Sequence, residues 1–379
     1  MDVKDPMELL GAELRERLET IVGRPEPGVE RPMEQLVWQF AQQARASLLA
    51  GSPLYAVLLL HAIADLEAEG VTWRLVRDHV APGRGNAIAL RVTAAVHRHV
   101  LTGRAPTLER FFASTGGSDS PHEAWPPFLA HMEAHEEELV PLVGLGCQTN
   151  EPGRASALMI GLLHVAKRFS HPVDLIEIGC AGGLNLRLDH FRYGGDGQAW
   201  GDPGSPVDLT GFWVDIDPVP DVTVEVASRL GVDPFPIDAT TEEGRLAITS
   251  SVWGDMGWRF RVLDGAFALA RAIPAPIVEA DGVDWVEQNL TTTPGRTTVL
   301  MQSVMREYLS EEAKQRLDAA VAAVGATATE DAPLAWIELE PITLIRRHGL
   351  RVTMWPSGEA LEPVTMSSLG PDVRRRTAD

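Results

Sequence analysis

Apolar residues in the first part of the chain recur at the spacing of an α-helix. The stretch MEQLVWQFAQQARASLLAG carries Leu36, Phe40, Ala44 and Leu48 four residues apart, which places them on one helix face. Further stretches of this kind follow, and two of them end in glycine, a common helix stop. The pattern predicts an all-helical N-terminal domain over residues 1–147.

A different pattern begins at Val173. Short apolar runs with the length of β-strands alternate with segments of helical periodicity. Such alternation is typical of a mostly parallel sheet with helices on both faces. Strands are expected at residues 173–178, 297–305, 334–341 and 350–356. Residues 148–379 are therefore expected to form an α/β domain, in which the glycine- and proline-rich segment 193–208 is a loop or a small hairpin.

Charge and composition exclude several classes of partner. The net charge is −20, from 53 acidic and 33 basic residues, and a surface this negative repels a nucleic-acid backbone. The apolar runs are far shorter than the roughly 20 residues that span a bilayer. The first residues have no apolar signal core, and the chain has two cysteines. We therefore expect a cytoplasmic protein that binds neither nucleic acid nor membrane.

One segment, VDLIEIGCAGGLNLRLDHF, joins an apolar strand to a helical pattern through very small residues. A backbone without large side chains can come close to a ligand, and ligands of open α/β sheets lie beyond the carboxyl ends of the strands. The helix after Gly183 is expected to direct its free N–H groups to this place. The order Glu177-x-Gly179-x-Ala181-x-Gly183 differs from the dinucleotide fingerprint G-x-G-x-x-G. The alternatives are a turn that binds nothing and a dinucleotide site.

This order resembles motif I of class I S-adenosylmethionine-dependent methyltransferases, with Ala181 in the place of the second glycine. The resemblance implies a Rossmann-like class I methyltransferase sheet. It also implies S-adenosyl-L-methionine as the cofactor. Glu177 would then organise the loop and the amino-acid part of the cofactor, while Gly179, Ala181 and Gly183 would leave room for it.

Three further positions are assigned through the same resemblance. RLGVDPFPID resembles the second-strand motif, in which Asp233 would bind the ribose hydroxyls, since a carboxylate can accept both. PIVEADGVDW resembles the third strand, with Asp281 at the adenine amino group, and VLMQSVMREYL resembles the fourth, with Gln302 among its polar residues. Capping of a turn is the alternative role for Asp233. Segment 193–208 lengthens the gap from motif I. The ribose-binding place could therefore also be taken by Asp215, Asp217 or Glu225.

Several segments together resemble a bacterial family of unknown function that joins a helical half to a methyltransferase-like half. They are QTNEPGR at 148–154, GCAGGLNL, the segment that begins YGG, and RLGVDPFPID. The family tends to end in a His-Pro-His-Gly stretch, which this chain lacks. QTNEPGR lies at the junction of the halves, so we expect its polar residues near the cofactor, namely Gln148, Asn150, Glu151 and Arg154. The helical half is expected to act as a lid with the acceptor pocket.

The predicted function is methyl transfer to a small-molecule acceptor. Alignment alone can supply much of the catalysis of an in-line displacement, and a general base, if the acceptor requires one, would be Glu151, His190 or Tyr193. The alternatives are a non-catalytic module that binds the cofactor or its product, and a nicotinamide-dependent oxidoreductase. No metal site is expected, because a charged, solvated helix face accounts for His131 and His135.

Overall fold

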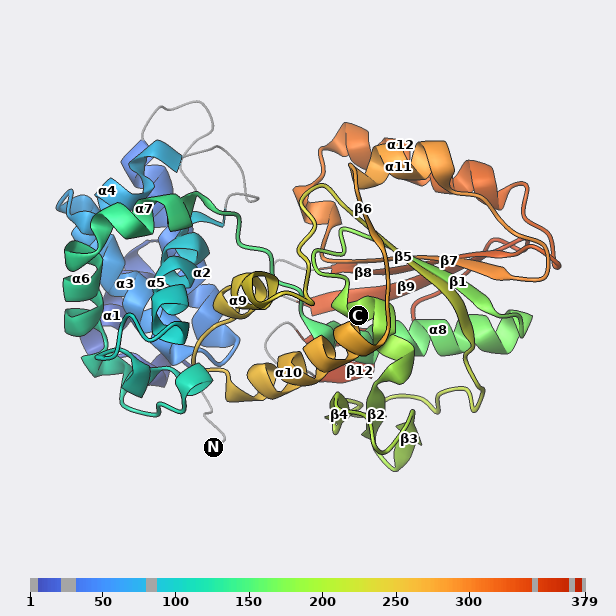
Figure 1. The fold of residues 1–379 in the computed structure, drawn as a ribbon, viewed down its shortest axis with the longest axis horizontal. Helices are drawn as coiled ribbons and strands as arrows, with labels where there is room; N and C mark the ends of the chain where they lie inside the picture. The colour runs from blue at the N-terminus through green and yellow to red at the C-terminus, as the bar shows by residue number, and fades with distance from the viewer. Residues whose placement is uncertain (1–5, 22–31, 80–86, 343–346, 368–371, 377–379) are drawn as a thin grey trace. The chain divides into compact units, whose positions relative to one another are not determined.

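The computed structural model describes residues 6–21, 32–79, 87–342, 347–367 and 372–376. The chain divides into two compact units (Figure 1). One comprises residues 1–149 together with 246–260, and the other comprises residues 150–245 and 261–379. The division at 149/150 lies two residues from the boundary that we predicted. The return of 246–260 to the helical unit had no sequence signal, because a helical pattern does not show which unit a helix packs against.

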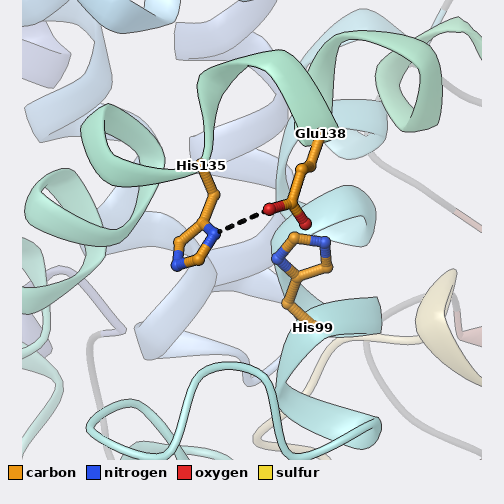
Figure 2. A group of neighbouring side chains, drawn as sticks. All are labelled: His99, His135 and Glu138. Atoms are coloured by element: carbon orange, nitrogen blue, oxygen red, sulfur yellow. Dashed lines mark hydrogen bonds and ion pairs between the residues drawn. The ribbon is translucent and has the colours of Figure 1, made fainter.

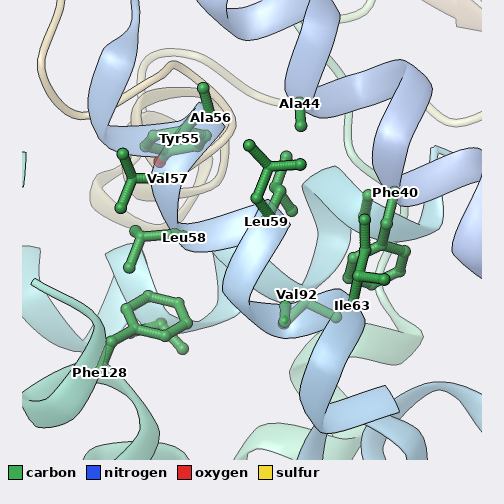
Figure 3. Close-up of a cluster of buried hydrophobic side chains, with 14 of the residues drawn as sticks. Phe40, Ala44, Tyr55, Ala56, Val57, Leu58, Leu59, Ile63, Val92 and Phe128 are labelled. Atoms are coloured by element: carbon green, nitrogen blue, oxygen red, sulfur yellow. The ribbon is translucent and has the colours of Figure 1, made fainter. Parts of the chain in front are cut away.

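The helical unit is organised around one apolar helix, α3 (Pro53–Glu67). Ten of its fifteen residues are buried, as expected for a helix that is apolar on all sides and surrounded by others. Figure 3 shows its side chains in a common core with those of neighbouring helices. The other helices of this unit are α1 (Ala12–Thr20), α2 (Pro32–Leu49), α4 (Val71–Val76), α5 (Ile88–Leu101), α6 (Trp125–Ala134) and α7 (Glu136–Gly144).

Asp255 attaches the returning segment to the start of α3. Its carboxylate accepts hydrogen bonds from the Ser52 hydroxyl (2.5 Å) and the Leu54 backbone N–H (2.9 Å). The N–H groups of a first helical turn lack intrahelical partners, so this carboxylate caps α3 from outside the helix. Gly254 is required beside it, since a Cβ at this position would lie 2.1 Å from the Phe112 ring.

The α/β unit contains a mostly parallel sheet in the order β6-β5-β1-β7-β8-β9-β11-β12. The first five strands of this order are mutually parallel, and β9 is antiparallel to β8. β10 (Glu359–Leu361) pairs with β9 outside the main order. The strand bounds are β1 (Val173–Ile178), β5 (Val226–Asp233), β6 (Ile277–Glu279), β7 (Thr297–Ser303), β8 (Leu334–Pro341), β9 (Arg347–Trp355), β11 (Val364–Ser367) and β12 (Val373–Arg375).

Helices cover both faces of this sheet, which confirms the predicted α/β arrangement. In Figure 1, α11 (Gly282–Asn289) and α12 (Glu311–Gly325) lie above the sheet and α8 (Ala155–Phe169) lies below it. Gly161 lets α8 approach closely, because a Cβ there would lie 3.1 Å from side chains of Ile337 and Val352. No helix in the described ranges is both long and apolar enough to cross a membrane.

The remaining elements connect these layers. The segment 193–208, predicted as a loop or small hairpin, contributes to a separate three-stranded sheet in the order β3-β2-β4. Its strands are β2 (Arg192–Gly195), β3 (Gln198–Trp200) and β4 (Asp208–Thr210), and the β2–β3 pair is the antiparallel hairpin. Two further helices, α9 (Glu242–Ser250) and α10 (Gly257–Ala272), begin or end in the returning segment.

The strand order reverses at β1, which determines where a ligand would bind. From β1 the chain continues to β5 and β6 on one side, and then returns to β7 and β8 on the other. Open α/β sheets bind ligands beyond the carboxyl ends of the strands at such a reversal. The loop that follows β1 begins at Gly179, directly at this point.

Replacing Asp255 with alanine tests the cap on α3. The change leaves the Leu54 N–H and the Ser52 hydroxyl without their acceptor, which should cost about 1–3 kcal/mol of stability. Chemical denaturation should show this loss, and hydrogen exchange should accelerate in peptides from the first turn of α3. The control is Glu133→Ala, which removes an exposed carboxylate from α6. Equal, small effects of both changes would contradict a capping role.

Candidate functional site: the loop after β1

The loop after β1 adopts a backbone conformation that few residue types tolerate. Gly179, Ala181 and Gly183 have φ values of +68°, +50° and +63°. Alanine at a positive φ costs free energy that glycine avoids. A Cβ at Gly179 would also lie 2.8 Å from the Met305 side chain. The glycines are therefore required by the turn itself, whether or not a ligand binds.

Three side chains from other parts of the α/β unit hold this loop. Asp233 Oδ2 accepts a hydrogen bond from the Ala181 N–H (2.8 Å), and Asn150 Oδ1 accepts one from the Leu184 N–H (2.9 Å). Arg187 Nη1 donates to the Gly183 carbonyl (2.6 Å). The loop is thus pinned at two N–H groups and one carbonyl.

These contacts correct the expectation that free N–H groups after Gly183 point towards a ligand. The Leu184 N–H is occupied by a protein side chain. The element that follows is also a 3₁₀ helix, η8 (Leu184–His190), with non-helical angles at Arg187. A short, kinked helix of this kind has a weak dipole, so anion binding at its N-terminus is not supported.

Glu177 is a buried acid at the end of β1. It is 1% exposed, and its Oε2 has no hydrogen-bond partner among the described residues. Burial raises the pKa of Glu177 to about 8, although Arg154 and a hydrogen bond with Asn185 lower it. The Oδ1 atom of Asn185 is also buried without a described partner. Unpaired buried polar atoms are costly, and in native proteins they often mark a functional site.

Arg154 brings positive charge to the carboxyl ends of the central strands. Its Nη1 donates to the carbonyl and the hydroxyl of Ser303 at the end of β7 (3.3 and 3.4 Å). It lowers the pKa of both Glu177 and Glu340, although burial raises each more strongly. Val304, the next residue after Ser303, has a φ of +53°, which is rare for a β-branched residue. Strained backbone thus lies at the ends of both β1 and β7, as is common at ligand sites.

Gln302 lies in a hydrogen-bonded network beside this point. Its Nε2 donates to Glu340 Oε1 (3.0 Å), and its Oε1 accepts from the Trp336 indole (3.3 Å). Glu340 also accepts from the backbone N–H groups of Met305 and Arg306. Both ends of the Gln302 amide therefore contact protein, and the side chain supports the loop after β7.

Asp233 and Asp281 lie at the carboxyl ends of adjacent strands. The Ala280 N–H donates to the Asp233 carbonyl (3.1 Å), which joins the ends of β5 and β6. Asp233 Oδ1 caps the turn through the Phe235 N–H (2.8 Å), and Asp281 Oδ1 caps α11 through the N–H groups of Val283 and Asp284. Both carboxylates thus perform the capping role that we weighed as the alternative for Asp233. Each oxygen can still accept a second hydrogen bond.

The competitors for the place of Asp233 lie elsewhere. Asp215 and Asp217 pair with Arg375, and the Glu225 carbonyl accepts from the Val173 N–H at the opposite, amino end of β1. The assignment of the second strand to RLGVDPFPID is consistent with this arrangement, since Asp233 is the last residue of β5.

Two of the three proposed general bases do not reach the loop. Tyr193 is fully buried, and its hydroxyl donates to the Leu188 carbonyl (2.6 Å), so a role as a base is not supported. His190 lies beside Asp189, and Asp189 pairs with Arg229. Arg229 stands in β5 four residues before its last residue, which corresponds to about 13 Å along the strand. His190 therefore lies away from the carboxyl edge.

Glu151 remains near the loop. Its Oε1 accepts from the Gly153 N–H (3.1 Å), which caps the short helix η7 (Pro152–Arg154). Its carbonyl accepts from Asn185 Nδ2 (3.5 Å). QTNEPGR therefore includes both a cap, at Glu151, and a direct contact with the loop, through Asn150.

Sequence reasoning missed the buried residues Asn185 and Arg187 and the partly buried Glu340. The first two alternate with Leu184, Leu186 and Leu188, and this pattern does not show that the polar residues are buried. Glu340 had a usable signal, since LAWIELEP places carboxylates at the end of an otherwise apolar strand. A separate cavity of about 490 Å³ borders this strand and is lined in part by Arg306, Trp336 and Glu340.

Fold and site together define a mixed α/β protein whose pinned, glycine-rich loop lies at the reversal point of a mostly parallel sheet. The chain belongs to the family described as uncharacterized protein conserved in bacteria, DUF2332, which matches residues 38–371. No curated protein and no solved structure matches the chain. The predicted membership of a bacterial family of unknown function is thus confirmed.

Replacing Asp233 with alanine should release the loop. The Ala181 and Phe235 N–H groups lose their acceptor, which should lower stability by about 1–3 kcal/mol and increase hydrogen exchange across residues 179–184. The matched control is Asp238→Ala, which removes an exposed carboxylate from the next turn, where it accepts from the Thr240 N–H. If both variants leave exchange in the loop unchanged, Asp233 does not hold it.

The raised pKa of Glu177 predicts a pH dependence of stability. In the folded protein Glu177 keeps its proton up to about pH 8, while the unfolded chain releases it near the ordinary value of 4.5. Stability from this group is therefore complete below about pH 4.5 and is lost as pH rises towards 8, at up to about 1.4 kcal/mol per unit. Glu177→Gln removes this slope, so the variant should gain stability relative to the parent as pH rises. Parallel stability profiles from pH 5 to 8 would contradict the raised pKa.

Proposed function

We propose that this protein binds S-adenosylmethionine at the carboxyl edge of β1, β5 and β7 and transfers its methyl group to a small-molecule acceptor. The observation that carries the proposal is the buried Glu177 oxygen, which has no hydrogen-bond partner in the described part of the chain and lies beside the glycine-rich loop. The reversal of strand order at β1 supports the same place on independent grounds. The Glu177-x-Gly179-x-Ala181-x-Gly183 order favours this ligand over a dinucleotide.

The charges at the edge fit the parts of this ligand. Its amino-acid portion carries an ammonium and a carboxylate, which would pair with Glu177 and Arg154 respectively. The ribose hydroxyls suit the remaining acceptor capacity of Asp233, and Asp281 on the adjacent strand is exposed enough to reach the adenine amino group. Asn150 and Gln302 would support the site indirectly, since they hold the backbone that forms it.

The bound ligand would supply an activated methyl group, so the protein need only align the acceptor with it. Glu151 is the one proposed base that contacts the elements of the loop. A specific observation favours a second candidate, a binding module without catalysis. The loop N–H groups of Ala181 and Leu184 are already occupied by protein side chains. These contacts hold the loop in place, which is sufficient for a protein that only binds a ligand.

Ligand binding and its coupling to a proton test the proposal. In a thermal-shift comparison, S-adenosylmethionine and S-adenosylhomocysteine should raise the melting temperature, and NADH and NADPH should not. Calorimetry with S-adenosylhomocysteine near pH 7 in buffers of different ionisation enthalpy should show release of about one proton, because the ligand ammonium favours the ionised form of Glu177.

Two variants make the binding test specific. Glu177→Gln should weaken binding about tenfold or more and abolish the proton release, whereas Asp215→Asn, which changes an exposed carboxylate paired with Arg375, should do neither. Gly183→Val is a poor probe, because its Cβ would meet the Leu186 and Ile277 side chains at 3.0 and 3.1 Å. Stabilisation by NADH alone would overturn the proposal. Binding without formation of S-adenosylhomocysteine from any acceptor tested would favour the binding module.

A further inference from the structure

The helical unit contains a cluster of three histidines and a glutamate, which we call the histidine cluster. His99 comes from α5, His131 from α6, His135 from the junction of α6 and α7, and Glu138 from α7. The ring centroids lie 4.4 Å apart for His131 and His135, 5.2 Å for His99 and His131, and 5.7 Å for His99 and His135. His99 thus meets three residues that lie 32 or more positions further along the chain.

Burial corrects the expectation of a solvated helix face. His99 is 1% exposed and His131 is 8% exposed, whereas His135 and Glu138 are partly open to solvent.

The two ring nitrogens of His99 differ in their hydrogen bonds. His99 Nδ1 lies 3.0 Å from His131 Nε2, and the Nε2 atom of His99 is buried without a hydrogen-bond partner among the described residues. If Nδ1 carries the proton and donates to His131, the Nε2 lone pair is available. A metal-binding histidine is commonly oriented in this way, by a hydrogen bond from its other nitrogen.

Figure 2 shows the His99 and His135 rings and the Glu138 carboxylate turned towards one another. One possible ligand atom from each of these three residues lies within 4.8 Å of the others. Ligand atoms at about 2.1 Å from a tetrahedral ion are roughly 3.4 Å apart, so a moderate contraction would close the site. His135 and Glu138, which are partly exposed, can supply this movement by rotation of their side chains.

We infer that His99, His135 and Glu138 bind a divalent transition-metal ion such as Zn²⁺, with His131 as the positioning residue that orients His99. Two imidazoles and a carboxylate are a donor set that suits zinc and its first-row neighbours. Three protein ligands leave a coordination position for water or another small ligand. This site lies within the helical unit and does not depend on the function proposed for the sheet.

Arg104 is the group that the ion must displace. Its Nη2 donates to Glu138 Oε2, while Glu138 Oε1 lies 3.3 Å from His135 Nδ1. The Arg104 side chain is about half exposed, so it can move into solvent when an ion takes the carboxylate. Exposed ion pairs of this kind contribute little free energy, and the chain's net charge of −20 favours cation binding in general.

Calorimetric titration of the full, chelator-treated chain with Zn²⁺ tests the inference, and Co²⁺ absorption spectra report the ligand set. We expect one ion per chain, nitrogen and oxygen ligands, and no thiolate charge-transfer band from Cys147 or Cys180. His135→Ala and Glu138→Gln should each weaken binding more than a hundredfold, and His131→Ala, which removes only the orienting contact, by about tenfold to a hundredfold.

The matched control is His122→Ala, an exposed histidine in the neighbouring 3₁₀ helix η6 (Pro121–Glu123), which should not change the affinity. Circular dichroism and the melting temperature identify any variant that is misfolded. Because His135 and Glu138 lie at the surface of the unit, their variants should remain folded where a His99 variant can fail. Absence of saturable 1:1 binding, or binding that survives both His135→Ala and Glu138→Gln, would overturn the inference.

Discussion

The hydrogen bond from the Ala181 N–H to the Asp233 carboxylate is the contact on which the candidate site depends. It joins the loop after β1 to the end of β5, two strands that are adjacent in the sheet but distant in the chain. Ala181 has a side chain and a positive φ, which costs free energy. This hydrogen bond helps to hold Ala181 in that conformation. Asn150 and Arg187 add a second N–H contact and a carbonyl contact, so that the loop is fixed from three directions.

Fixing the loop in this way requires charged groups to be buried at the sheet edge. Glu177, Asp233 and Arg187 are each 5% exposed or less. Burial of isolated charges is costly, and the edge reduces this cost in two ways. Asp233 and Arg187 are hydrogen-bonded to backbone groups, whereas Glu177 is neutralised, as its raised pKa indicates. Of these three residues, Glu177 is thus the one that keeps a side-chain oxygen without a described partner.

The helical unit presents a similar contrast between satisfied and unsatisfied polar groups. Asp255 is partly buried, and burial raises its pKa, but it is held by the Ser52 hydroxyl and the Leu54 N–H. His99 is buried and keeps one nitrogen without a described partner. The Asp255 carboxylate has its hydrogen-bond partners within the chain, so its role is structural. His99 Nε2 and Glu177 Oε2 have no partner among the described residues, and each marks a candidate site.

The sequence by itself determined the local structure and the place of the loop. Short apolar runs located the strands at 173–178, 297–303 and 334–341, and helical periodicity located the helices of the first part of the chain. Small residues after an apolar strand located the loop, because only such residues tolerate its backbone angles and close contacts. These features depend on neighbours in the chain, and local physical chemistry is sufficient to predict them.

Only the tertiary structure decided which polar residues meet and which are buried. Tyr193 was one of three candidate general bases and is instead fully buried, with its hydroxyl bonded to the Leu188 carbonyl. Asp233 caps a turn, and Asp281 caps α11. The pairs Asn150–Leu184, Arg154–Ser303 and His99–His131 join residues 32 to 149 positions apart. Sequence periodicity carries no information about such pairs, because the distance between two side chains in space is set by how whole helices and strands pack, and the burial of a polar group depends on neighbours that the chain brings from elsewhere.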